Sequence, residues 1–132
     1  MRPFIFIARY VYAICRIKFS VFSDGLISSC VKYFIGKPAA AVCVCRRGGA
    51  TAAFQTLQMP FQMCNMPIVT SQYWNIAYGR EEGETARDIE GMQTMRTLAC
   101  NMAWMLKKIH GVETGDKPER EPWTPMNFIR TN

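Results

Sequence analysis

An uncharged run of small residues, Ala39–Cys45, most constrains how this chain can fold. A continuous apolar run of this length, without alternation between polar and apolar residues, is typical of a strand buried on both faces, as in a parallel sheet. A turn at residues 36–38 precedes the run, and a loop of two arginines and two glycines at 46–49 follows it. The sequence therefore predicts a buried strand that ends abruptly in a charged, glycine-rich loop.

A helix and a second short strand are expected to follow this loop. Residues 50–64 are rich in helix formers and carry apolar side chains along one side, although Pro60 should kink or split the helix. A turn at residues 65–67 then leads into residues 68–71, which predict a short strand. Strand, loop, helix and strand in this order form a βαβ unit.

The clearest helical pattern follows an aromatic loop at residues 72–79. Polar residues such as Glu90, Gln93 and Lys107 lie on one face of the expected helix, Thr85 is the expected N-cap, and Gly111 follows its last turn. We therefore predict a long amphipathic helix whose methionines fill the core. The apolar positions recur every three or four residues: Ile89, Met92, Met95, Leu98, Met102, Met105, Leu106 and Ile109.

The first 22 residues combine apolar bulk with basic residues and allow several interpretations. Their apolar spacing forms a helical stripe, yet aromatic residues also occupy the other faces. The segment is an N-terminal helix or strand packed on the domain, a basic amphipathic helix on a membrane surface, or a substitute for a missing part of a larger fold. A signal peptide matches poorly, because basic residues interrupt the apolar run and no small-residue cleavage site follows.

Composition restricts the class of protein further. The 132 residues, 49% of them hydrophobic, match one globular domain and exclude a disordered chain. The net charge of +6 comes from residues 1–50, where eight basic residues face Asp24 alone. Such a basic half is compatible with a nucleic acid, an anionic membrane or a phosphorylated ligand. We interpret the six cysteines as reduced, which predicts a cytoplasmic protein.

Seven blocks of sequence also carry a resemblance to a known family. They are GKPAAAV (36–42), RRGGATAAF (46–54), MPIV (66–69), SQYWN (71–75), EGMQTMRTL (90–98), NMAW (101–104) and NFIR (127–130). Together these blocks resemble the flavodoxin-like NAD(P)H-dependent FMN reductase family, in the branch that includes iron-sulfur flavoproteins. The resemblance covers roughly residues 22–130 and therefore only the C-terminal portion of that family.

The resemblance implies an α/β fold: a truncated, flavodoxin-like doubly wound parallel sheet of which the last two strands and the last two helices are present. The family's phosphate-binding loop and the cysteine cluster that some relatives use for an iron-sulfur centre are missing. The implied organisation is an atypical N-terminal segment at 1–22, the C-terminal part of a flavodoxin-like domain at 23–111, and an irregular tail at 112–132.

The resemblance also implies a set of cofactor-binding residues, because in the family the loop at 46–49 borders the flavin. The arginines of this loop would place positive charge near the flavin. From the residues alone, the loop is equally a charged tight turn, and the aromatic residues a plug at the end of the sheet or a dimer contact. The binding residues that the resemblance implies are Arg46, Arg47, Gly48, Gly49, Ala50 and Thr51. Tyr73 and Trp74, with Tyr78, are expected to form a second wall of the site, because the loop after the neighbouring strand opens on the same side of the sheet.

The implied function is hydride transfer from NAD(P)H to FMN, followed by electron delivery to an acceptor, which is chemistry that the cofactor carries. We expect neither a catalytic triad nor a metal site, since Cys43 and Cys45 lack the two-residue gap of a redox pair and His110 is the only histidine. One alternative is a non-catalytic remnant that cannot retain FMN.

A basic nucleic-acid or membrane-surface module is the other alternative, and the weakest, because arginine and aromatic residues are not interleaved as such modules require. We therefore expect neither a nucleic acid nor a membrane as partner. A homo-oligomer is expected as partner instead. Either residues 1–35 supply replacement elements for the sheet, or its exposed edge near Val42 pairs with a second copy.

Overall fold

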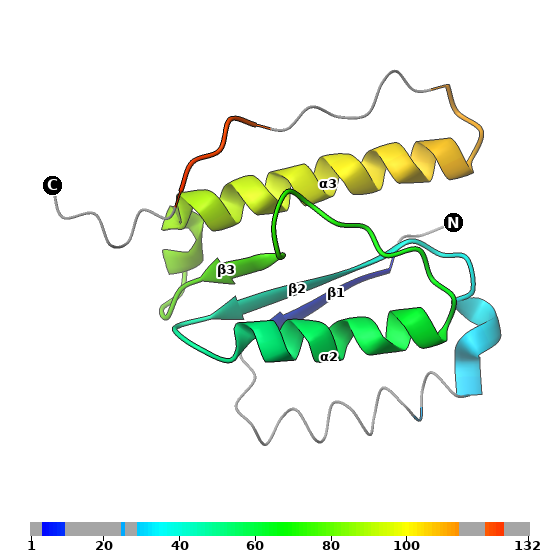
Figure 1. Cartoon of the computed structure of the whole chain (residues 1–132), viewed down its shortest axis with the longest axis horizontal. Helices are drawn as coiled ribbons and strands as arrows, with labels where there is room; N and C mark the ends of the chain where they lie inside the picture. Colours follow the sequence, from blue (N-terminus) through cyan, green and yellow to red (C-terminus); the bar gives the residue numbers. More distant parts are fainter. Residues whose placement is uncertain (1–3, 10–24, 26–28, 114–120, 126–132) are drawn as a thin grey trace, which may run out of the picture.

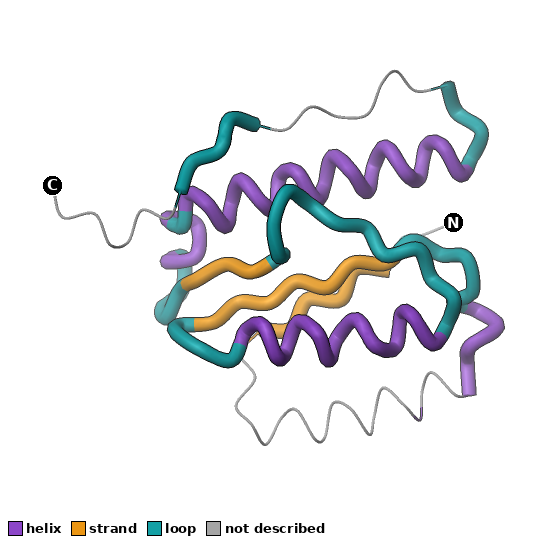
Figure 2. The backbone as a smooth tube through the Cα atoms, viewed as in Figure 1, coloured by secondary structure: helices purple, strands orange, loops and turns teal. Residues whose placement is uncertain are grey.

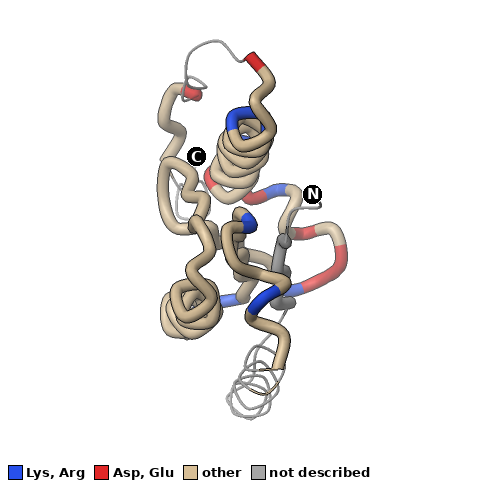
Figure 3. Tube along the Cα trace, turned by 90° about the vertical axis from the view of Figure 1, so that its right-hand side faces the viewer, with Lys and Arg blue, Asp and Glu red and all other residues tan. Residues whose placement is uncertain are grey.

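The structure is a computed structural model that describes residues 4–9, 25, 29–113 and 121–125. Strands β1, β2 and β3 form a parallel sheet in the order β1-β2-β3, and Figures 1 and 3 show helices α2 and α3 on opposite sides of it. This arrangement is an α/β architecture. The elements, coloured by type in Figure 2, are β1 (Phe4–Arg9), the 3-10 helix η1 (Val31–Tyr33), β2 (Ala39–Cys45), α2 (Ala50–Met63), β3 (Ile76–Tyr78), the 3-10 helix η2 (Glu84–Arg87) and α3 (Ile89–Ile109).

Strand β2 is the centre of the fold, as the sequence predicts. Ala39, Ala40 and Ala41 are completely buried, and the side chains of β2 alternate between two apolar clusters. One cluster lies against α2 and contains Phe54. The other lies against α3 and contains Leu98. The prediction of a strand buried on both faces is therefore confirmed, and the small side chains are those of a strand covered by a helix on each side.

Of the interpretations open for the N-terminal segment, the structure shows a strand at residues 4–9: β1 runs parallel to β2 from Phe4↔Ala39 to Arg9↔Val44, so the helical stripe does not predict this part. Backbone N–H and C=O groups on this side of β2 need partners when buried, and pairing with β1 supplies them. Of the two alternatives for the sheet edge near Val42, the structure shows the first: the N-terminal segment supplies β1, and Val42 lies opposite Ile7. Residues 10–22 lie outside the described part of the chain, so the remaining interpretations of that segment stay predictions.

The second strand is displaced from its predicted position. Residues 68–71 make only an isolated bridge, Ala39↔Ile68, and the strand β3 is at Ile76–Tyr78, inside the expected aromatic loop. Between the pair Ala39↔Ile68 and the pair Cys43↔Ile76, β2 advances four residues while its partner advances eight. The excess residues leave the sheet as a loop, because hydrogen bonds on either side hold the partner segment to β2.

Asn75 closes the gap that this loop leaves in the sheet. Its Nδ2 donates a hydrogen bond to the carbonyl oxygen of Ala41 at 3.0 Å, in place of a backbone donor. The backbone carbonyl oxygen of Asn75 accepts a hydrogen bond from the N–H of Cys43 at 2.9 Å. Asn75 is only 2% exposed, so the Ala41 carbonyl would otherwise be buried without this partner. One side chain therefore permits the loop without exposing the strand beside it.

Helix α2 follows the prediction except at Pro60. The side chains predicted to share one side are all buried: Ala53, Phe54, Leu57, Phe61 and Cys64. Pro60 does not split the helix, which continues to Met63. The proline lies in the last turn, so its missing N–H costs one hydrogen bond and leaves little helix beyond it to disrupt.

Helix α3 begins later than expected, because Asp88 and not Thr85 is the N-cap. Thr85 instead lies in η2. Leu98 and Met102 are buried as predicted, whereas Gln93, expected on the solvent face, is 3% exposed and therefore also buried. Gly111 ends the helix as predicted, with a left-handed backbone at φ 68°.

The segment at 121–125 has no regular secondary structure, as expected for this part of the tail, and returns along α3 (Figure 1). Within the described ranges, neither α2 nor α3 is both long and apolar enough to cross a lipid bilayer.

We predict that Asn75→Ala lowers the free energy of unfolding by about 1–3 kcal/mol, because it leaves the buried Ala41 carbonyl without a donor. Chemical denaturation measures the change. Asn101→Ala is the matched control, since the Asn101 amide also donates to a carbonyl, that of Thr70, but at an exposed position. Equal losses from the two substitutions would contradict the role assigned to Asn75.

Candidate functional site

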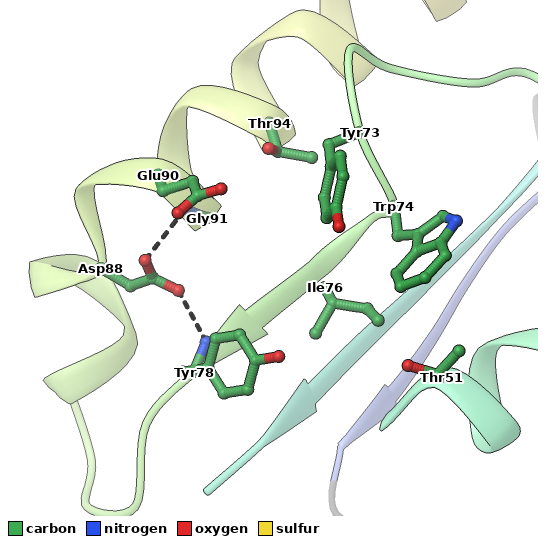
Figure 4. Close-up of a pocket in the computed structure, with 9 residues that line it drawn as sticks. All are labelled: Thr51, Tyr73, Trp74, Ile76, Tyr78, Asp88, Glu90, Gly91 and Thr94. Carbon is green, nitrogen blue, oxygen red and sulfur yellow. Dashed lines mark hydrogen bonds between the residues drawn. The ribbon is translucent and has the colours of Figure 1, made fainter. Parts of the chain in front are cut away.

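A pocket of about 170 Å³ lies beside the outer edge of β3, where α2 and α3 face each other past the strand (Figure 4). It lies toward the carboxyl ends of the strands, near the first turns of both helices, which is where open α/β sheets bind ligands. Its lining residues come from α2, from the loop before β3, from β3 itself and from the start of α3: Thr51, Tyr73, Trp74, Ile76, Tyr78, Asp88, Glu90, Gly91 and Thr94.

Two adjacent aromatic residues, Tyr73 and Trp74, form the wall contributed by the loop before β3. Their ring centroids are 5.2 Å apart, and the side chains are 56% and 50% exposed. A tight turn holds the loop, because the Ser71 hydroxyl donates to the carbonyl oxygen of Tyr73 at 2.6 Å. The displaced strand therefore creates this wall: the residues that leave the sheet are the ones that reach the pocket.

Asp88 joins the edge of β3 to the start of α3. Its Oδ2 accepts a hydrogen bond from the N–H of Tyr78 at 2.7 Å, and its Oδ1 accepts one from the N–H of Gly91 at 2.9 Å. The carboxylate is 2% exposed and lies at a helix N-terminus, where the helix dipole favours negative charge. The Asp88 carboxylate thus accepts hydrogen bonds from a backbone N–H of the edge strand and from a backbone N–H in the first turn of α3. These two bonds fix α3 against β3.

Gly91 allows this close approach. A Cβ atom at Gly91 would meet the carboxylate of Asp88, with its Cγ at 2.8 Å, and the Cβ of Ala77 at 2.9 Å. Real Cβ atoms do not approach other atoms so closely, so any side chain would displace Asp88 or β3. Gly91 is therefore required for the contact between α3 and β3, not for an unusual backbone conformation.

The pocket offers hydroxyl groups and aromatic faces to a ligand. Figure 4 shows the hydroxyls of Tyr73 and Tyr78 directed toward the space beside Ile76. Burial raises the pKa of Tyr78, and Cys45 and Asp88 nearby add to the rise, so the phenol stays protonated and can donate a hydrogen bond. None of the nine lining residues is Lys, Arg, His or Cys. The arrangement suits a small planar ligand with hydrogen-bond acceptors.

The structure brings three of the eight predicted binding residues together, namely Thr51, Tyr73 and Trp74. The four residues at 46–49 do not line the pocket; they are exposed in the loop between β2 and α2, with Gly49 as the N-cap of α2 at φ 86°. This loop ends two residues before Thr51, so it lies beside the pocket rather than in it. Ala50 is buried in the cluster between α2 and the sheet, which leaves its side chain no route to a ligand.

Sequence reasoning missed five lining residues: Ile76, Asp88, Glu90, Gly91 and Thr94. The sequence predicts a loop at Ile76, and it predicts the N-cap of the long helix at Thr85, three residues before the observed N-cap Asp88. One signal was available, because Asp88 precedes Gly91 by three residues, the spacing of an N-cap side chain and the N–H that it binds.

The two cysteines of β2, Cys43 and Cys45, are not part of a metal-binding group formed by described residues. Both lie on the α2 face of the sheet, as their alternate spacing predicts. Burial raises the pKa of the Cys43 thiol to about 11, with a smaller contribution from Cys45. Burial likewise raises the pKa of Cys45. Among the residues that the structure describes, no group of three or more His, Cys, Asp or Glu side chains is placed to hold a metal ion.

Comparison of this chain with models of protein families, with curated proteins and with solved structures finds no match.

We predict that Gly91→Ala destabilises the fold, although the same change inside an ordinary helix stabilises it by about 0.5–1 kcal/mol. The added methyl group displaces the Asp88 carboxylate or Ala77. Thermal and denaturant unfolding measure the effect. The control is Ala99→Gly at an exposed position of α3, which is expected to cost about 1 kcal/mol through helix propensity alone. If Gly91→Ala stabilises the fold, then a Cβ atom at residue 91 fits between Asp88 and Ala77, and the role assigned to Gly91 is wrong.

We further predict that Cys43 resists alkylation. With a pKa of about 11 instead of 9.0, its thiolate fraction at pH 8 is about 100-fold lower than normal, and burial slows the reaction further. Cys100, which is exposed, is the internal control and should be alkylated faster than Cys43. Iodoacetamide labelling followed by peptide mass spectrometry gives both rates, and comparable rates would contradict the burial of Cys43.

Proposed function

We propose that this chain binds the flavin ring of FMN in the pocket beside β3 and serves electron transfer as a flavin reductase of the NAD(P)H-dependent type. The same proposal treats the sheet β1-β2-β3 as part of a flavodoxin-like fold. One observation carries it: Thr51 from α2 and the pair Tyr73 and Trp74 from the loop before β3, all three predicted binding residues, line one pocket.

The chemistry of the lining supports a flavin-like ligand. Aromatic faces at Tyr73 and Trp74 can stack on a planar ring system. The protonated hydroxyl of Tyr78 and the hydroxyls of Thr51 and Thr94 can bind ring carbonyl oxygens and nitrogens. The cofactor, when bound, supplies the hydride and electron chemistry, so this chain need only hold and orient it.

The size and charge of the pocket restrict how the cofactor would be held. Its volume of about 170 Å³ is below the roughly 300–1,000 Å³ of pockets that enclose drug-sized ligands, so it suits part of the ring system. The lining contains no basic side chain to receive a phosphate. Arg46 and Arg47 are exposed in the loop that leads into α2, five and four residues before Thr51, and would supply positive charge near the pocket.

A second candidate is a folded remnant that does not retain FMN. The observation in favour of this remnant is that two acidic residues, Asp88 and Glu90, line the pocket. Negative charge there opposes an anionic cofactor. The two candidates differ in a single measurable property, the affinity for flavin.

We predict that the chain binds FMN and riboflavin, and that Trp74→Ala raises both dissociation constants about three- to tenfold through loss of ring stacking. Quenching of flavin fluorescence in a titration measures them. Tyr33→Ala is the matched control, since Tyr33 is as exposed as Trp74 but lies in η1 outside the lining. Arg46→Ala with Arg47→Ala should weaken FMN more than riboflavin, because only FMN carries the phosphate. If neither flavin binds the unaltered chain at millimolar concentration, the remnant is the correct candidate.

A further inference from the structure

The segment at 121–125 is held on α3 by a buried side-chain amide. Nε2 of Gln93 donates to the carbonyl oxygen of Pro122 at 2.6 Å, and Oε1 of Gln93 accepts from the N–H of Thr124 at 3.1 Å. Nε2 also approaches Oε2 of Glu121 at 3.3 Å. Gln93 thus binds the C=O and N–H groups of alternate residues, which is how a neighbouring strand would bind an extended peptide.

Two further contacts select particular side chains of the segment. Arg96 binds Glu121 through two hydrogen bonds, Nε to Oε1 at 2.7 Å and a terminal nitrogen to Oε2 at 2.8 Å. Such a paired geometry matches the two oxygens of a carboxylate and favours an acidic side chain at this position. The ring of Trp123 lies 6.0 Å from that of Tyr73, centroid to centroid. Arg96 and Tyr73 therefore recognise an acidic residue and an aromatic residue two positions later. The side-chain amide of Gln93 binds the backbone of the same segment.

The contacts are those of a bound peptide rather than of a core element. The segment forms no helix or strand, and Trp123 remains 52% exposed while docked. The side chains of Arg96 and Glu121 are 57% and 40% exposed, so solvent and salt weaken their attraction. The pKa of Glu121 is lowered, chiefly by its hydrogen bonds to Arg96, so the carboxylate is ionised at neutral pH. Each contact is modest, and together they permit reversible release.

We propose that Gln93, Arg96 and Tyr73 form a peptide-binding site that the chain's own residues 121–124 occupy, and that this site binds extended peptides with an acidic residue two positions before an aromatic residue. A peptide from another protein must displace the chain's own segment to bind. The site shares Tyr73 with the pocket, whereas Gln93 and Arg96 lie outside the pocket lining, so the proposal does not require that flavin binds.

Competition between the chain's own segment and an added peptide tests the proposal. The probe is a fluorescent peptide of sequence EREPWTPM, residues 119–126, and the protein is the full chain. In the variant Glu121→Ala with Trp123→Ala, the chain's own segment loses both selective contacts. Fluorescence anisotropy should show this variant binding the peptide at least tenfold more tightly than the unaltered chain, because a tethered segment competes at an effective concentration of about millimolar.

A charge exchange supplies the control for specificity. Adding Arg96→Glu to that variant should weaken binding of EREPWTPM at least tenfold and restore binding of a peptide with arginine in place of its second glutamate. Arg96 is exposed, so its substitution should leave the fold intact, which circular dichroism checks. The proposal is overturned if the released variant binds the peptide no more tightly than the unaltered chain, or if the charge of residue 96 has no effect on which peptide binds.

Discussion

The hydrogen bond from the Asn75 side chain to the Ala41 carbonyl is the interaction on which the rest of the structure depends. It lets the chain leave the sheet after Ile68 and return at Ile76 without exposing a buried carbonyl on β2. The residues released in this way include Tyr73 and Trp74, which form one wall of the pocket. A regular strand over the same residues would direct alternate side chains into the two faces of the sheet and leave its edge without an aromatic wall.

On the other side of the pocket, Asp88 holds α3 against the edge of the sheet. An edge strand presents unpaired N–H groups, and Asp88 takes the one at Tyr78 while also capping α3 through Gly91. The start of α3 is therefore fixed at the edge of β3, and Gly91 makes the approach close enough. Through Gln93, one turn further along, the same helix holds the C-terminal segment. Pocket and peptide site thus share one rigid element and meet at Tyr73.

The predictions from sequence were right where the signal is local and wrong where it depends on a distant partner. The strand Ala39–Cys45 and the apolar side of α2 follow from short runs and helical spacing. Residues 4–9 carry an equally helical spacing, but they form a strand because β2 offers unpaired groups that only a strand can match. Gln93 reads as a solvent-facing residue, and it is buried because the segment at 121–125 covers it. Neither partner is near in sequence.

By itself, the sequence determined an α/β chain with a small-residue central strand and two amphipathic helices, because side-chain size and periodicity act over a few residues. Only the tertiary structure decided where the second strand pairs, which side chains surround the pocket, and that Arg46 and Arg47 lie outside its lining. Those outcomes depend on buried hydrogen bonds between residues far apart in the chain, Asn75 with Ala41 and Gln93 with Pro122. The energy of such bonds depends on burial, which no local pattern specifies.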